Sequence, residues 1–181
     1  PTILPAPGQV AKKLAAVSRS GIGASGLVVL APDGSVLASR SADKALAPAS
    51  TMKLLTSLAA LDTIGADHTF TTRVVRSGTR IVLIGGGDPL LTDKQSRSAA
   101  RPASLQGLAA ATVAALSAAG VKKVELGYDT SLFSGPAFST AWKDKWHSWV
   151  ARVSPLVIGS GRFNQWQADP SPARTAATAF A

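Results

Sequence analysis

A serine and a lysine three residues apart, Ser50 and Lys53, are the side chains of this sequence best suited to nucleophilic chemistry. The apolar run that follows over residues 54–61 predicts a helix, and residues three apart lie on one helical face. The Ser50 hydroxyl and the Lys53 amine can therefore meet. A serine hydroxyl is a weak nucleophile until a base takes its proton, and a partly buried lysine with a lowered pKa can be that base.

The position of the serine favours this chemistry over a chance pairing. Pro48 disfavours helical structure in the residue before it, so we expect the helix to begin at about Ser50. The N–H groups of a first helical turn have no partner inside the helix, and they can donate to a developing oxyanion. The alternative is an ordinary solvated helix face, because Ser and Lys three apart also occur together by chance.

The composition limits the other kinds of chemistry. The 181 residues include no Cys, which excludes disulfides, zinc–thiolate sites and a thiol nucleophile. We expect no metal ion and no cofactor, because the sequence lacks clustered carboxylates and an H-E-x-x-H pattern. The net charge of +9 suits an anionic partner. The Lys and Arg residues are scattered and match no nucleic-acid motif, so we expect no nucleic acid and interpret the charge first as a soluble basic surface.

The spacing of apolar residues predicts a mixed α/β (α+β) fold. Helices are expected over residues 9–18, ending at Gly21, over 50–64 and 104–119, and from 169–172 onward. Strands are expected over 25–30, 35–40, 68–75, 80–84, 121–128 and 152–158, and the turn at 32–34 joins the first two as a hairpin. The last helix is still running at Ala181, so we expect more chain beyond it.

Two tryptophans, Trp142 and Trp146, form a second candidate site, with Lys143, Lys145 and His147 interleaved. They can line a cleft for a peptide or a sugar. Aromatic packing under a loop is the alternative, and a stacking platform for nucleic acid is a thinner one.

Two other patterns indicate no functional site. The three glycines at 85–87 lack the G-K-[ST] ending of a phosphate cradle, so we interpret them as a tight turn. His68 and His147 lie far apart, and neither has a local pattern that supports a Ser-His-Asp triad.

Several segments, in this order, together resemble one protein family. They are residues 28–39, residues 48–56 with the S-x-x-K tetrad, residues 83–91 with Gly-Gly-Gly-Asp-Pro, and residues 128–136. They resemble the class C low-molecular-mass penicillin-binding proteins, the D-alanyl-D-alanine carboxypeptidase/endopeptidase group (DacB, peptidase S13), and most closely its actinobacterial members. The resemblance spans nearly the whole chain, and its tetrad also marks class A β-lactamases.

The resemblance implies a transpeptidase-like domain, an antiparallel sheet covered by helices, with further α/β domains inserted into it. Residues 1–68 are then the N-terminal part of the catalytic domain, and residues 69–181 belong to the insertions. Ser50 is expected to attack the terminal D-Ala-D-Ala bond of a peptidoglycan stem peptide, with Lys53 as its base. β-Lactams are expected to acylate Ser50 as substrate mimics, and a cell-wall substrate implies an extracytoplasmic protein, secreted or associated with the envelope.

The family also needs an S-x-N and a K-T-G motif, and this sequence holds no Lys-Thr-Gly and no convincing S-x-N. We therefore expect both on a C-terminal continuation or on a second fragment. Two alternatives stay open. One is a β-lactamase-like serine hydrolase, and the other is a non-catalytic peptidoglycan-binding module that uses the tryptophans and the basic charge.

Overall fold

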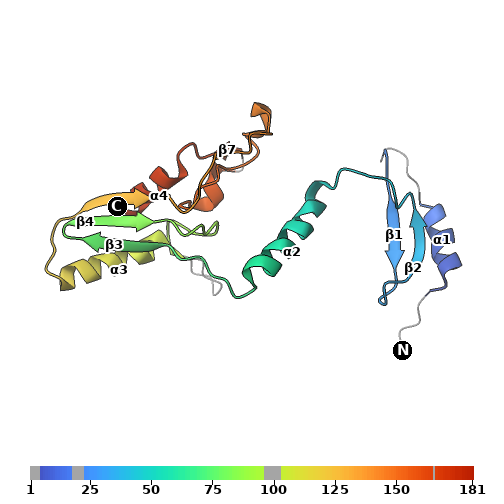
Figure 1. The fold of residues 1–181 in the computed structure, drawn as a ribbon, viewed down its shortest axis with the longest axis horizontal. Helices are drawn as coiled ribbons and strands as arrows, with labels where there is room; N and C mark the ends of the chain where they lie inside the picture. The colour runs from blue at the N-terminus through green and yellow to red at the C-terminus, as the bar shows by residue number, and fades with distance from the viewer. Residues whose placement is uncertain (1–4, 18–22, 96–102, 165) are drawn as a thin grey trace. The chain divides into compact units, whose positions relative to one another are not determined.

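A computed structural model describes residues 5–17, 23–95, 103–164 and 166–181. The chain divides into two compact units, Pro1–Asp67 (unit 1) and His68–Ala181 (unit 2), each with its own helices and strands (Figure 1). The mixed α/β class expected from the sequence is confirmed.

Unit 1 is a hairpin flanked by helices. Helix α1 spans Pro7–Ala15, and the antiparallel strands β1 (Leu27–Leu30) and β2 (Val36–Arg40) form the expected hairpin. Helix α1 packs against β2 (Figure 1), where Arg40 Nη1 donates to the Leu14 carbonyl at 3.4 Å. Helix α2, Met52–Ile64, follows a 3₁₀ turn over Ala49–Thr51 and ends at Gly65, whose φ of 83° favours glycine.

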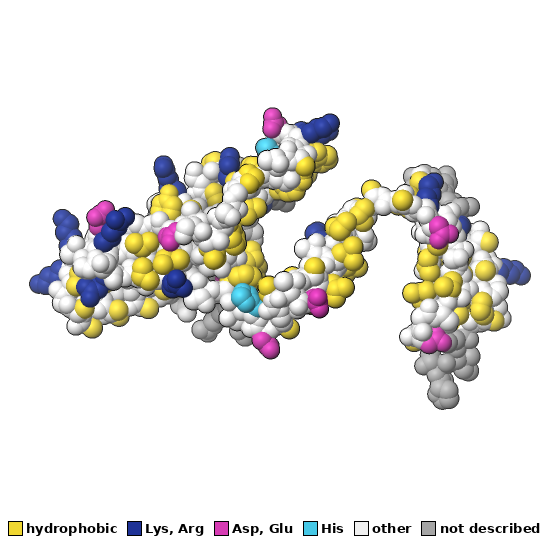
Figure 2. Space-filling view, viewed as in Figure 1, with side chains coloured by type: hydrophobic (Ala, Val, Ile, Leu, Met, Phe, Trp, Pro, Cys, Tyr) yellow, Lys and Arg dark blue, Asp and Glu magenta, His cyan; other side chains and the backbone are white. Residues whose placement is uncertain are grey.

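Helix α2 buries none of its residues. Its large apolar side chains are 46% to 73% exposed: Met52, Leu54, Leu55, Leu58, Leu61 and Ile64. Figure 2 shows hydrophobic side chains along this helix. Among the described residues of unit 1, Ala31 alone is buried. A helix that is apolar around its circumference normally lies inside a larger core, and unit 1 does not supply one.

Unit 2 is built on a three-stranded sheet. Strands β3 (Arg73–Ser77) and β4 (Arg80–Ile84) pair antiparallel, and β5 (Glu125–Asp129) adds beside β4 in parallel. Helix α3 (Leu105–Ala118) makes the crossover that a parallel pair requires (Figure 1). Helix α4 (Pro172–Phe180) packs against α3 and β5, and a short hairpin of β6 (Arg162–Asn164) and β7 (Gln167–Ala168) precedes it.

The core of unit 2 joins strand, helix and loop. Alternate residues of β4 face inward, as the two-residue period of a strand dictates. They meet buried residues from the loops and both helices, so the cluster comprises Ile81, Leu83, Leu91, Leu105, Leu156, Ala176 and Phe180. Ser104 caps α3 by accepting the Gly107 N–H at 3.1 Å, as its sequence predicts.

The turn after β4 lies later than the glycines that predicted it, because residues 85–88 are irregular and the chain turns at 89–90. We call residues 85–90 the glycine turn, and close backbone approaches explain two of its glycines. A Cβ on Gly85 would lie 2.6 Å from the Pro155 carbonyl, and a Cβ on Gly86 would overlap the Thr71 backbone. The Gly87 N–H donates to the Pro155 carbonyl at 2.7 Å. This turn therefore holds the segment around Pro155 against the end of the sheet.

The predicted strand over residues 152–158 is wrong. Pro155 has no N–H to donate, and the Ser154 hydroxyl both donates to the Leu156 carbonyl and accepts the Leu156 N–H. Local bonds thus replace a strand ladder, although Leu156 is fully buried. The run is buried at residues 155–157, while Val153 is 62% exposed.

Other predicted bounds shift at the ends. Strand β3 starts at Arg73 rather than 68, and β5 starts at Glu125 rather than 121, because the Val121 N–H still bonds back to Leu116 in the last turn of α3. Helix α1 starts at Pro7, a preferred first helical residue, and its predicted end at Gly21 lies outside the described residues. Within the described residues, every helix falls short of the length and apolar character needed to cross a bilayer.

Candidate active site

Ser50 lies in the 3₁₀ turn that opens α2, one residue before the Thr51 N-cap of the α-helix. The turn is closed at Pro48, whose carbonyl accepts both the Thr51 N–H at 3.0 Å and the Thr51 hydroxyl. In a 3₁₀ turn residues three apart are nearly eclipsed, so this junction places Ser50 and Lys53 on one side of the helix entrance. The helix therefore begins about where the sequence predicts.

The backbone beside Ser50 is strained. Ala49 has φ of 45°, in the left-handed region that a Cβ disfavours. Such outliers persist where the surrounding structure holds them, and they cluster at functional positions. The strain sits one residue from the predicted nucleophile, at the point where the chain turns from Pro48 into the helix.

The polar atoms of Ser50 are available for chemistry. Among the residues that the structure describes, neither the Ser50 hydroxyl nor the Ser50 N–H has a hydrogen-bond partner. Ser50 is also exposed. A free hydroxyl can attack a carbonyl, and a free N–H at the same residue can donate to the oxyanion that the attack creates.

Lys53 is exposed as well, and within the described part of the chain it has no ion-pair partner. The role of base requires partial burial, which disfavours the charged form of lysine. Unit 1 does not provide that burial.

The tryptophan segment belongs to unit 2, where it includes a 3₁₀ turn over Asp144–Trp146. Phe138 and His147 stack with ring centroids 4.2 Å apart and planes within 7°, and the Arg152 guanidinium lies 5.0 Å from the Phe138 centroid. His147 Nδ1 lies 3.9 Å from Asp144, a weak pair at the surface. Phe138, His147 and Arg152 thus fix the base of the segment.

Trp142 and Trp146 stand outside this stack. Trp142 is 45% exposed and Trp146 is 50% exposed, with the Lys145 ammonium 5.2 Å from the Trp146 ring. Packing under a loop accounts for only about half of each ring. Their role in substrate binding stays a prediction, and they lie in a different unit from Ser50 and Lys53.

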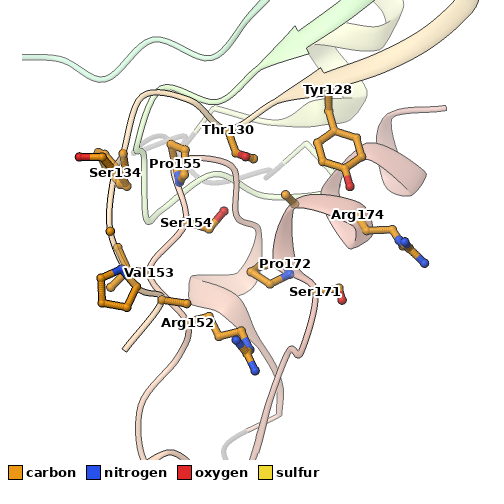
Figure 3. Close-up of a pocket in the computed structure, with 15 residues that line it drawn as sticks. Tyr128, Thr130, Ser134, Arg152, Val153, Ser154, Pro155, Ser171, Pro172 and Arg174 are labelled. Carbon is orange, nitrogen blue, oxygen red and sulfur yellow. The ribbon is translucent and has the colours of Figure 1, made fainter. Parts of the chain in front are cut away.

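Unit 2 also contains a pocket of about 370 Å³ that the sequence did not reveal. Its walls come from the end of β5, residues 133–137, residues 152–155 and the start of α4. Figure 3 shows the Thr130, Ser154 and Tyr128 side chains around it, with Pro172 of α4 opposite. No carboxylate lines the pocket. These segments are far apart in sequence and share no motif, so only the fold brings them together.

Asp129 lies beside this pocket at the end of β5. Its Oδ1 accepts the Ser131 N–H at 2.7 Å, and this bond, helped by the charge of Arg73, lowers the pKa of the carboxyl below its usual range. Asp33 in the hairpin of unit 1 has a pKa lowered in the same direction, by bonds from the Ser35 hydroxyl and N–H. Both carboxylates therefore stay charged and stabilise turns. Among the described residues, no group of three or more His, Asp or Glu side chains could hold a metal ion.

Comparison with known proteins identifies the family. The model of the D-Ala-D-Ala carboxypeptidase 3 (S13) family matches residues 8–178. Carboxypeptidase Rv3627c of Mycobacterium tuberculosis is 32% identical over 164 residues, which is 84% of this chain and 34% of the relative. The D-alanyl-D-alanine carboxypeptidase of Actinomadura sp. is 33% identical over 150 residues, which is 76% of this chain and 26% of the relative.

The chain belongs to the D-Ala-D-Ala carboxypeptidase 3 (S13) family, as the resemblance predicted. It spans about a third or less of the length of these curated relatives.

Proposed function

We propose that this chain carries the nucleophile of a serine-type D-Ala-D-Ala carboxypeptidase, with Ser50 as the acylated residue and Lys53 as its base. The observation that carries the proposal is the entrance of α2, where the Ser50 hydroxyl and N–H are both free and Lys53 lies one turn further on. Family membership supports the substrate, the stem peptide of peptidoglycan.

In the proposed reaction, Ser50 Oγ attacks the carbonyl carbon of the terminal D-Ala-D-Ala peptide bond while neutral Lys53 takes the hydroxyl proton. The oxyanion that forms accepts the Ser50 N–H. The C–N bond then breaks, the leaving D-Ala amine takes a proton, and the peptide stays on Ser50 as an ester. Water hydrolyses the ester and restores the hydroxyl. A β-lactam follows the first half of this path and stays attached.

The exposed α2 indicates what the reaction still requires. Lys53 must be partly desolvated to be neutral, and the apolar side chains of α2 must be covered, yet unit 1 does neither. We propose that further chain, corresponding to the part of the relatives that this sequence does not span, packs on α2 and supplies the S-x-N and K-T-G motifs. The proposed substrate implies an extracytoplasmic protein, and Trp142 and Trp146 are proposed to line the peptide's path.

The test is labelling of the full-length protein with a fluorescent penicillin, together with measurement of D-Ala release. Ser50→Ala is expected to abolish labelling and to lower D-Ala release by about 10³-fold or more, because no other hydroxyl replaces the nucleophile. Ser57→Ala, on the same helix and also exposed, is the matched control and is expected to label normally. Labelling that persists in Ser50→Ala would overturn the proposal.

The half-exposed tryptophans favour one second candidate, a peptidoglycan-binding module without catalysis. It predicts binding to insoluble peptidoglycan that survives Ser50→Ala and falls in Trp142→Ala. A β-lactamase-like hydrolase, the other alternative, predicts fast turnover of the acyl-enzyme, which a deacylation rate separates from a carboxypeptidase.

A further inference from the structure

The positive charge of the protein is unevenly divided between the two units. Unit 2 contains 13 Lys and Arg against 6 Asp and Glu, a net +7, whereas unit 1 contains 6 against 4, a net +2. Scattered along the sequence, these charges predicted nothing beyond a basic surface. The fold of unit 2 gathers four of them at one end.

The sheet register produces this gathering. Strands β4 and β5 are parallel, so both begin at the end of the sheet where the turn from β3 to β4 lies, and the Glu125 N–H bonds to the Thr79 carbonyl at 2.8 Å. Arg76 of β3 and Arg80 of β4 flank this turn, and the loop from α3 to β5 carries Lys122 and Lys123. We call this surface the basic end of unit 2.

The four basic side chains are exposed, and none forms an ion pair among the described residues. Arg76 donates locally, to the Gly78 carbonyl at 3.1 Å. Glu125 is the one carboxylate within residues 76–80 and 120–125. Figure 2 shows dark-blue side chains crowding this end, which Figure 1 identifies by the β3–β4 turn and the end of α3. The basic end therefore presents a net positive charge to solvent.

An apolar pocket of about 480 Å³ opens beside Lys122 and Lys123, between α3 and the loop that leads to β5. Val113, Leu116, Val121 and Val124 line it, with Lys122 and Lys123 among its lining residues. Val113, on α3, is 62% exposed. A purely ionic partner would leave this apolar surface in water, whereas an amphiphilic one would cover it and meet the charges at the same time.

We propose that the basic end of unit 2 docks the protein on an anionic phospholipid surface. Lipid headgroup phosphates contact Lys122, Lys123, Arg76 and Arg80. Val113 and the other apolar residues of the pocket contact the boundary between headgroups and acyl chains. The contact is peripheral and salt-sensitive, because it depends on surface charge. It involves neither Ser50 nor the tryptophans, so it is independent of the proposed carboxypeptidase activity.

The test is co-sedimentation of the full-length protein with vesicles of phosphatidylcholine alone or with about 30% phosphatidylglycerol. Binding is expected only to the anionic vesicles and is lost in high salt. The double substitution Lys122→Gln/Lys123→Gln is expected to weaken partitioning about thirtyfold, since each basic residue near such a surface contributes about fivefold. The matched control, Lys12→Gln/Lys13→Gln on α1, removes the same charge and is expected to change partitioning onto the vesicles less than twofold.

Two further arms make the proposal falsifiable. Val113→Asn is expected to weaken vesicle binding, whereas Val17→Asn, at a similar exposure of 57%, is expected to leave it unchanged. Equal losses from the two lysine pairs, or no loss from Val113→Asn, would overturn a bilayer site. Ser50→Ala is expected to bind vesicles like the parent protein, so a failure here is separable from a failure of the proposed enzyme activity.

Discussion

Unit 2 closes an apolar core around Leu83, Leu105 and Leu156, each fully buried, whereas the described part of unit 1 buries Ala31 alone. Both units hold similar elements, a hairpin and helices, and both contain many apolar residues. The difference lies in whether those residues have a partner. Helix α2 of unit 1 leaves all of its leucines exposed, while α3 and α4 of unit 2 pack on a sheet and on each other.

This contrast shows which unit needs a further segment of polypeptide for the proposed chemistry. The predicted nucleophile and base lie in the unit that cannot bury its own helix, and the unit with the complete core carries neither. An active site usually needs a rigid scaffold to hold its groups in place. If Ser50 and Lys53 act as proposed, their final positions depend on the surface that covers α2.

The largest effect expected from this contrast is a difference between two leucine truncations. Leu83→Ala should lower the free energy of unfolding of unit 2 by about 3–4 kcal/mol, because it leaves a cavity in a closed core. Leu58→Ala, at 64% exposure, should cost less than about 0.5 kcal/mol in this chain. Hydrogen exchange read separately over each unit measures both.

The same two leucine substitutions test this difference between the units in the full-length protein. If further chain covers α2 as proposed, the cost of Leu58→Ala should rise toward that of Leu83→Ala. A cost that stays small in the full-length protein would mean that α2 is never buried, and it would remove the reason to expect a desolvated Lys53.

A smaller effect, still confined to unit 2, should follow from its glycine turn. Gly86→Ala should cost about 3 kcal/mol, because the added Cβ overlaps the Thr71 backbone. Gly127→Ala on β5, where the nearest atom to a new Cβ is 3.6 Å away, is the control and should change stability little. Urea unfolding followed by tryptophan fluorescence reports this, since all four tryptophans lie in unit 2. Equal costs at the two glycines would contradict the close packing described for the turn.

The smallest expected effect belongs to unit 1. Ala49→Gly should raise the stability of unit 1 by about 0.5–1 kcal/mol. Glycine adopts a φ of 45° without the steric penalty that alanine has there, and this gain outweighs the larger entropy that glycine loses on folding. Hydrogen exchange of the amides of α2 in the full-length protein measures the change. Faster exchange in the variant would show that the left-handed residue costs unit 1 nothing.

The sequence predicted best those features that depend on neighbouring residues. The Asp33–Ser35 turn, the Ser104 cap and the stop of α2 at Gly65 all follow from local chemistry, and the structure contains each of them. Ser50 and Lys53 could be proposed as a site for the same reason, because one turn of helix separates them, and their role stays a prediction. The hairpin of β6 and β7 went unpredicted, since its strands are only three and two residues long.

Features that depend on distant residues were missed. The run at 152–158 is buried only at residues 155–157, and the glycine turn, rather than a neighbouring strand, determines its backbone. The pocket beside Asp129 and the basic end of unit 2 both combine segments tens of residues apart, so no local sequence pattern predicts them. The left-handed Ala49 has no sequence signal either, because alanine is a poor choice for that conformation.

The uncovered α2 has a consequence for how such a protein is made. Domains generally fold as units while the ribosome extends the chain, and the earlier segment usually folds first. Here unit 2 forms its core within residues 68–181, whereas α2 buries none of its residues. If further chain covers α2 as proposed, we expect unit 2 to fold first and Ser50 to reach its final position only after that covering segment has been made.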